Sequence, residues 1–296
     1  MRRLIAVAAL LILALAGCRA SRPLSSQLEK VEFRSEALEK SMRVNVYLPA
    51  GYTPDHRYPV LYMLHGYSGD EEAWAKLGLL KQADELIARG KIQPLIIVLP
   101  QIDNSFGINS GGRAMAVMPS DLKNSPFMGR YEDYLYQDLI RFVEGKYPAM
   151  ATREGRWIGG LSMGGFAAIH LAFRHPDLFS RTGGHSPAIW TDNFEDQYME
   201  NWLYPPDLRA ERDPIAIARS QDLSSLEVYL DCGSSDSLGL YKGTAELAEM
   251  LRARGVRSQY HLNAGDHNAA YWQAHLEEYL LFYTGRQEGT GSRASG

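Results

Sequence analysis

The chain has little cysteine, little net charge and no apolar run long enough to cross a bilayer. Two cysteines in 296 residues exclude a disulfide-rich scaffold, so stability must come from a hydrophobic core. A formal net charge of −4 gives no basic field for nucleic acid. No H-E-x-x-H, paired C-x-x-C or phosphate-binding glycine loop occurs, so metal and nucleotide chemistry lack support. We therefore expect no cofactor, no metal ion and no nucleic-acid partner.

The N-terminus carries a short apolar run that is typical of a signal peptide. Two arginines precede residues 4–15, which are too few to span a bilayer as a stable helix. The next residues, "LAGC", resemble the lipobox of bacterial lipoproteins, which implies cleavage before Cys18 and acylation of its thiol. The alternative is a secreted protein in which this cysteine lies there by chance. We expect a protein of the bacterial cell envelope, anchored only by lipid at Cys18, in the outer membrane if the envelope has two.

The rest of the chain is long and apolar enough for one large domain, since 45% of its residues are hydrophobic. We predict a lipoprotein signal peptide over residues 1–17 and a tether over 18–30. One large folded domain is expected over 31–285, followed by a disordered tail over 286–296. Acylation of Cys18 would leave Cys232 as the single thiol, so no intrachain disulfide is expected.

Apolar runs alternate with helical patterns along this domain. "PVLYMLHG" and "PLIIVLP" are continuous apolar runs, as in strands buried on both faces of a parallel sheet. In "SMRVNVYLP" apolar and polar residues alternate, which favours an edge or antiparallel strand with one solvent-exposed face. The alternation predicts an α/β fold with a mostly parallel central sheet and helices on both faces. Residues 101–130 and 186–223 break the rhythm, and we expect them to be long functional loops that follow strands.

One serine lies between glycines in "GGLSMGGF", residues 159–166. A structural turn would explain the glycines, but it would not explain the flanking pattern. "EGRWIGG" before the serine suits a strand, and "MGGFAAIHLAFRHP" after it suits a buried helix. A strand, a sharp turn and a helix form the nucleophile elbow of α/β hydrolases. We therefore predict that Ser162 is a nucleophile.

A serine hydroxyl needs a base, and the base needs a group that fixes its tautomer. In α/β hydrolases an acid follows a late strand, and a histidine follows the last one. "LDCGSSDSLG" offers Asp231 and Asp236, of which Asp236 is favoured because it lies in an exposed turn. His267 lies in the loop between the last predicted strand and the last predicted helix, so we predict it to be the base.

The oxyanion of a tetrahedral intermediate needs two backbone donors. We predict the N–H groups of Met163, directly after the nucleophile, and of Tyr67, in the "HGYSG" turn after the first buried strand. Candidate substrate contacts are aromatic residues near these segments. They are Trp74, Phe106, Trp190 and Trp272.

Several consecutive segments resemble the putative-esterase family of α/β hydrolases, which includes feruloyl esterases, S-formylglutathione hydrolases, enterochelin-type esterases and mycolyltransferases. They are "VLYMLHGYSGDEEAW", "VLPQIDNSF", "YEDYLYQDLIRFVEGKYP", "GLSMGG", "LDCGSSDSL" and "GDHNAAYW", in family order. The resemblance implies that Ser162, Asp236 and His267 act as nucleophile, acid and base, with Met163 and Tyr67 as oxyanion donors. The mycolyltransferases carry a glutamate where Asp236 stands, and an exported protein fits a cytosolic glutathione-linked role poorly.

These features predict a serine esterase that hydrolyses uncharged esters with short acyl or hydroxycinnamoyl groups, carried on carbohydrate. The expected partner is therefore a small-molecule or carbohydrate ester. Two alternatives remain open at this point. One is acyl transfer to an envelope acceptor, which shares the same acyl-enzyme. The other is a non-catalytic surface protein that binds glycans or partners on the same fold.

Overall fold

The computed structural model describes residues 25–110, 128–191, 194 and 197–285. The signal peptide, Cys18, most of the predicted tether and the predicted tail therefore lie outside the described residues. None of the helices within the described ranges is long and apolar enough to cross a membrane.

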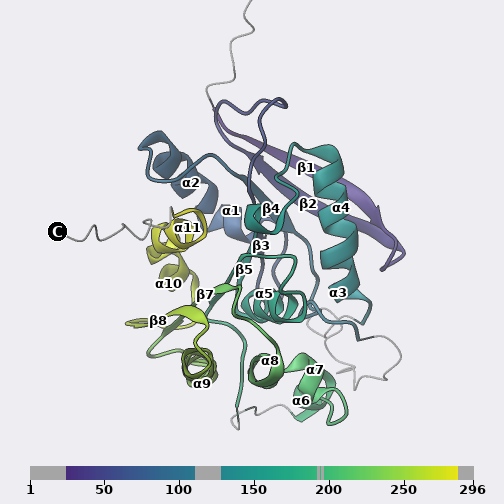
Figure 1. The fold of residues 1–296 in the computed structure, drawn as a ribbon, viewed down its shortest axis with the longest axis vertical. Coiled ribbons are helices and arrows are strands. Elements are labelled where there is room, and N and C mark those ends of the chain that lie inside the picture. Colours follow the sequence, from purple (N-terminus) through teal and green to yellow (C-terminus); the bar gives the residue numbers. More distant parts are fainter. Residues whose placement is uncertain (1–24, 111–127, 192–193, 195–196, 286–296) are drawn as a thin grey trace, which may run out of the picture.

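An eight-stranded sheet forms the centre of the molecule, in the order β1-β2-β4-β3-β5-β6-β7-β8 (Figure 1). The first two strands pair antiparallel with each other, β2 pairs antiparallel with β4, and the remaining neighbours are parallel. The strands are β1 (Gln27–Ser35), β2 (Lys40–Leu48), β3 (Val60–Leu64), β4 (Ile96–Pro100), β5 (Arg156–Leu161), β6 (Arg181–His185), β7 (Glu227–Gly233) and β8 (Arg257–Asn263). This mostly parallel sheet confirms the predicted fold class.

Helices cover both faces of the sheet, and each face has its own apolar core. One core lies beneath α3 (Tyr131–Asp133), a π-helical turn (Tyr134–Leu139), α4 (Ile140–Lys146), α5 (Met163–Arg174), α8 (Pro214–Ser220) and α9 (Tyr241–Ala253). The other lies beneath α1 (Ala73–Lys76), α2 (Leu79–Ala88), α10 (Ala269–Ala274) and α11 (Leu276–Thr284). Helix α5 is buried along nearly its whole length, because its apolar residues surround it on all sides.

The prediction that one face of β2 is solvent-exposed is wrong at two positions. Asn45 and Tyr47 are only 2% and 1% exposed. Strand β1, which the sequence pattern did not reveal, pairs with β2 and takes the edge position itself. The Asn45 amide donates to the carbonyl of Glu71, and the Tyr47 hydroxyl donates to Asp84, so both polar groups are paired. Strand β1 begins at Gln27, inside the range 18–30 predicted as a tether.

The range 186–223, predicted as one long loop, contains three short helices. They are α6 (Gln197–Leu203), α7 (Arg209–Arg212) and α8. Helix α8 begins with a clear capping signal, since the Asp213 side chain accepts from the backbone N–H of Ile215 and Pro214 takes the first helical position. The predicted last helix is broken into α10 and α11 at His275. Residues 111–127 of the other predicted loop lie outside the described residues.

Candidate active site

Ser162 lies on the sharp turn between β5 and α5, as the sequence predicts. Its backbone has φ 53° and ψ −119°, a strained conformation for a residue with a Cβ. The turn closes so tightly that a Cβ on Gly160 would lie 2.3 Å from the backbone of Gly164, and one on Gly164 would lie 2.3 Å from the carbonyl oxygen of Leu64. Only glycine fits these two positions, which explains the spacing around the serine.

The Ser162 hydroxyl begins a continuous line of hydrogen bonds. Its Oγ lies 2.9 Å from Nε2 of His267, which follows β8 in the loop before α10. On the other side of the imidazole ring, Nδ1 lies 2.8 Å from Oδ2 of Asp236, in the turn after β7. The three residues come from three separate loops at the carboxyl ends of parallel strands, where open α/β sheets place their sites.

The Asp236 side chain is buried, although its turn was predicted to be exposed. Burial alone would raise the pKa of this carboxyl, but hydrogen bonds from His267, Cys232 and the Leu238 backbone outweigh it, and the pKa lies below its usual value. Oδ1 accepts from the N–H groups of Leu238 and Leu240, at 3.0 and 3.4 Å, while Oδ2 faces His267. At neutral pH this side chain is therefore a carboxylate, oriented to accept a hydrogen bond from Nδ1–H of His267.

The second candidate acid, Asp231, serves a different set of partners. It is 0% exposed within β7. Its Oδ1 lies 3.0 Å from Nδ1 of His185, and its Oδ2 accepts from the hydroxyls of Tyr271 at 2.7 Å and Tyr279 at 2.9 Å. Both oxygens are thus engaged inside the protein, on the face covered by α10 and α11.

The "HGYSG" turn lies against Ser162, where the prediction requires an oxyanion donor. A Cβ on Gly66 would lie 3.5 Å from the Cβ of Ser162. The next residue is Tyr67, and the turn is fixed by the N–H of Ser68, which donates to Oδ1 of Asn104 at 2.7 Å. Met163 is the first residue of α5, so the geometry of a helix N-terminus leaves its N–H outside the intrahelical ladder. Both predicted donors are thus adjacent to Ser162.

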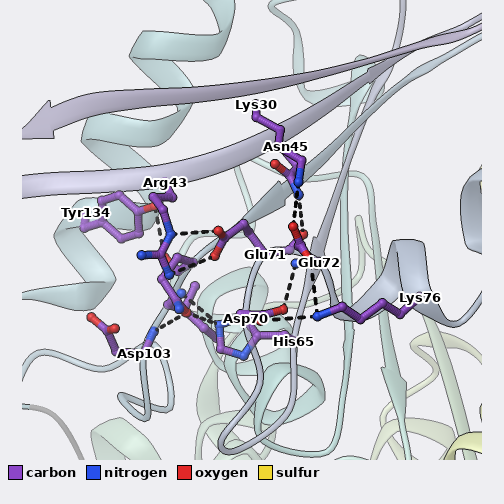
Figure 2. Close-up of polar contacts among 12 residues, drawn as sticks. Lys30, Arg43, Asn45, His65, Asp70, Glu71, Glu72, Lys76, Asp103 and Tyr134 are labelled. Atoms are coloured by element: carbon purple, nitrogen blue, oxygen red, sulfur yellow. Dashed lines mark hydrogen bonds and ion pairs between the residues drawn. The ribbon is translucent and has the colours of Figure 1, made fainter.

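Charged side chains hold the segment that follows this turn against the antiparallel strands (Figure 2). Arg43 on β2 donates to the Glu71 carboxylate at 2.7 Å, and Lys30 on β1 donates to Glu72 at 2.6 Å. The Asn45 amide bonds the carbonyl of Glu71 between them. These contacts tie the segment that follows Tyr67 to strands β1 and β2.

Trp74 is not a substrate contact, which corrects the prediction. Its side chain is 1% exposed, its Nε1 donates to the carbonyl of Leu64 at 2.9 Å, and its ring packs edge-on against His185 and Tyr279. An aromatic residue after a buried strand can serve either the core or a pocket, and here the indole N–H has an internal partner.

The other predicted aromatic contacts lie among residues of the candidate site. Trp190 is partly exposed and Trp272 is 9% exposed, with its ring 5.0 Å from that of His267. Phe106 is 2% exposed and lies beneath Trp190, at 6.4 Å, and Tyr67, at 6.0 Å, so it supports the aromatic surface from below. Trp202, whose ring lies 5.9 Å from Phe106, joins the cluster.

The fold and the strained serine turn define a serine hydrolase of the α/β-hydrolase class. Residues 35–283 match the family described as "Putative esterase", and the chain belongs to this family. The protein is therefore a serine esterase, as predicted.

Known proteins resemble the chain over most of its length. An endo-1,4-beta-xylanase/feruloyl esterase of Xylanibacter ruminicola is 28% identical over 85% of this chain, which corresponds to only 30% of that longer protein. A solved ferulic acid esterase is 26% identical with a TM-score of 0.73, covering 88% of this chain and 98% of its own. A fluorophosphonate-binding serine hydrolase of Staphylococcus aureus shares the fold, with a TM-score of 0.70 at 21% identity, over 88% of this chain and 98% of its own.

Proposed function

We propose that this protein is a serine carboxylesterase that cleaves uncharged, carbohydrate-linked esters of short or hydroxycinnamoyl acids through an acyl-enzyme. The observation that carries the proposal is the line of hydrogen bonds from Ser162 through His267 to Asp236, which begins at a strained turn between a strand and a helix. A protein that only binds ligands has no need of such a line, which argues against the non-catalytic alternative.

Each residue has a defined task in this mechanism. The Oγ of Ser162 attacks the ester carbonyl while Nε2 of His267 takes its proton. The N–H groups of Met163 and Tyr67 donate to the oxyanion that forms. When the intermediate collapses, His267 returns the proton to the leaving alcohol, and the acyl group stays on Ser162. Water then attacks the acyl-enzyme by the same route, and the acid and a free Ser162 are released.

Asp236 makes His267 effective as a base. Its carboxylate accepts a hydrogen bond from the Nδ1–H group, which keeps the proton on Nδ1 and leaves Nε2 free to accept the proton of Ser162. When the imidazole becomes an imidazolium in the transition state, the same carboxylate stabilises the new positive charge. Because the pKa of Asp236 is lowered, the carboxylate is in its charged form over the neutral range in which the imidazole must be unprotonated.

The choice of substrate rests on the aromatic residues near the nucleophile. Tyr67 and Trp190 are partly exposed and are backed by Phe106, so a flat acyl group or a sugar ring can stack there. The names of two relatives, a xylanase/feruloyl esterase and a ferulic acid esterase, support the same class of ester. We therefore assign acetyl and hydroxycinnamoyl sugar esters as the preferred substrates.

A panel of acyl donors tests this assignment. We expect kcat/KM on acetyl and hydroxycinnamoyl sugar esters to exceed that on long-chain esters and on glutathione thioesters by about 10-fold or more, because one extra pocket contact is typically worth that factor. The measurement uses purified protein that lacks residues 1–18, with products identified by mass spectrometry. A preference for long-chain or glutathione-linked acyl groups would contradict the sugar-ester assignment and leave the serine mechanism intact.

The same panel separates hydrolysis from acyl transfer. Parallel reactions contain a sugar acceptor at high concentration, and free acid is expected as the main product in both sets. Accumulation of acylated acceptor in place of free acid would assign the protein as a transferase.

We also propose that the protein is a lipoprotein of the bacterial envelope, anchored through Cys18 in the "LAGC" segment. Cys18→Ser is expected to abolish lipid labelling and to release the protein from the membrane fraction, since only a thiol can receive the first acyl anchor. Incorporation of a clickable fatty acid and sedimentation of membranes measure the two effects, and Cys232→Ser is the matched control. A Cys18→Ser protein that still sediments with membranes would place the anchor elsewhere.

A further inference from the structure

A buried polar network connects the centre of the sheet to the loop that carries His267. At its middle is Asp231, 0% exposed on β7. Two tyrosine hydroxyls donate to the same oxygen of its carboxylate, Tyr271 from α10 at 2.7 Å and Tyr279 from α11 at 2.9 Å. The network lies outside the line from Ser162 to Asp236, and the proposed chemistry gives it no task. Of its two tyrosines, Tyr271 lies in the helix that directly follows the His267 loop, whereas Tyr279 lies in the next helix.

Tyr271 contacts the His267 loop on both sides of the histidine. Before it, a Cβ on Gly265 would lie 2.6 Å from the Tyr271 ring, so the loop rests directly on this ring. After it, the N–H of Tyr271 donates to the Asn268 side chain at 3.1 Å and closes the first turn of α10. The amide of Asn263, where the loop begins, lies 3.3 Å from the Tyr271 hydroxyl.

The residue next to Tyr271 touches the imidazole itself. The Trp272 ring meets that of His267 edge-on, with centroids 5.0 Å apart and an interplanar angle of 85°. A shift of α10 would therefore move the surface on which His267 rests. Tyr279 belongs to α11, and its ring stacks on that of His185 at 3.6 Å.

We propose that Tyr271 is a positioning residue for His267: its hydroxyl, anchored on Asp231, holds α10 and the 263–268 loop so that Trp272 supports the imidazole at the correct distance from Ser162. This inference rests on the proposed serine mechanism. Strand β7 and the turn after it fix the imidazole of His267 in two ways. Asp231 on β7 binds the Tyr271 hydroxyl and so anchors α10, while Asp236 in the turn binds the imidazole directly.

The two tyrosines provide a matched pair of variants. Tyr271→Phe and Tyr279→Phe each keep a buried ring and each remove one hydrogen bond to the same carboxylate oxygen, so both should lower the melting temperature. Tyr271→Phe also removes the acceptor of the Asn263 amide, so its decrease should be somewhat larger. Only Tyr271→Phe should affect catalysis. We expect its kcat to fall about 10-fold with KM unchanged, because small misplacements of a catalytic group are costly. Tyr279→Phe should stay within about 2-fold of the wild type.

A spectroscopic readout makes the test independent of esterase activity. The proton between Nδ1 of His267 and Asp236 is expected to give a far-downfield NMR resonance, sharp in the wild type and in Tyr279→Phe but broadened or shifted in Tyr271→Phe. If the wild type hydrolyses no ester, the proposed function fails while this comparison still tests the positioning. Equal kcat values and equal resonances in the two variants would overturn the inference.

Should Tyr271→Phe not fold, Trp272→Leu tests the same support from its other end. Loss of the indole edge is expected to broaden the His267 resonance and to lower kcat, since the imidazole then loses its ring contact. A Trp272→Leu protein with unchanged resonance and unchanged kcat would equally overturn the proposal.

Discussion

Ser162→Ala is expected to abolish hydrolysis of a short-chain p-nitrophenyl ester, lowering kcat by at least about 10⁴-fold, because no other group can form the acyl-enzyme. Thermal unfolding should change little, since the substitution deletes one hydroxyl and keeps the Cβ that the strained turn already holds. Initial rates and scanning calorimetry on the same preparation measure the two effects. A fluorophosphonate probe, which labels serine nucleophiles, should label the wild type and leave the variant unlabelled.

Ser186→Ala is the matched control for this prediction. Ser186 also has a positive φ, of 46°, and is fully buried near the site, so the two substitutions disturb similar backbone environments. We expect Ser186→Ala to retain activity within a few-fold. Turnover that persists in Ser162→Ala, or that is lost equally in both variants, would remove the central claim.

Asp236→Asn is expected to lower kcat by about 10⁴-fold with little effect on folding. The carboxamide offers an N–H where the carboxylate accepted one, so the imidazole turns to the tautomer that cannot take the Ser162 proton. Asp231→Asn should instead mainly lower stability and should affect kcat much less. Its carboxylate accepts from two tyrosine hydroxyls inside the protein, and mispaired donors there cost about 1–3 kcal/mol each.

Urea unfolding and steady-state kinetics distinguish the two aspartates. Asp231→Asn should lose several kcal/mol of unfolding free energy while its kcat falls far less than that of Asp236→Asn. If Asp236→Asn were the unstable protein and Asp231→Asn the inactive one, the assignment of the acid would have to be exchanged.

The parts of the site that follow from local geometry could be predicted from the sequence. The turn at Ser162 leaves no room for a Cβ on Gly160 or Gly164. Glycines at these two positions, close to the serine in the sequence, therefore indicate the turn. The candidates His267 and Asp236 followed from chain order, because loops at the carboxyl ends of successive parallel strands meet at one edge of the sheet.

Features that depend on distant contacts could not be predicted in the same way. Strand β6 contains two adjacent glycines: Gly183 leaves room for the Tyr283 hydroxyl of helix α11, and Gly184 leaves room for the Ile169 side chain of helix α5. On the inward face of strand β1 only Val31 and Phe33 are apolar and both are only partly buried, so the apolar signal in its sequence is weak. Trp74 was assigned to the substrate pocket because position along the chain does not say which face of the sheet a side chain covers.

The buried thiol of Cys232, beside Asp236, can be used to detect opening of the candidate site. Cys232 is 0% exposed, is the only cysteine among the described residues, and lies 3.4 Å from Oδ2 of Asp236. Burial raises the pKa of this thiol, so in the closed structure it is both shielded and a poor nucleophile toward alkylating reagents. Its alkylation therefore requires this part of the protein to open. The rate of that reaction therefore reports how readily the structure around Cys232, and with it the surroundings of Asp236, opens when no substrate is present.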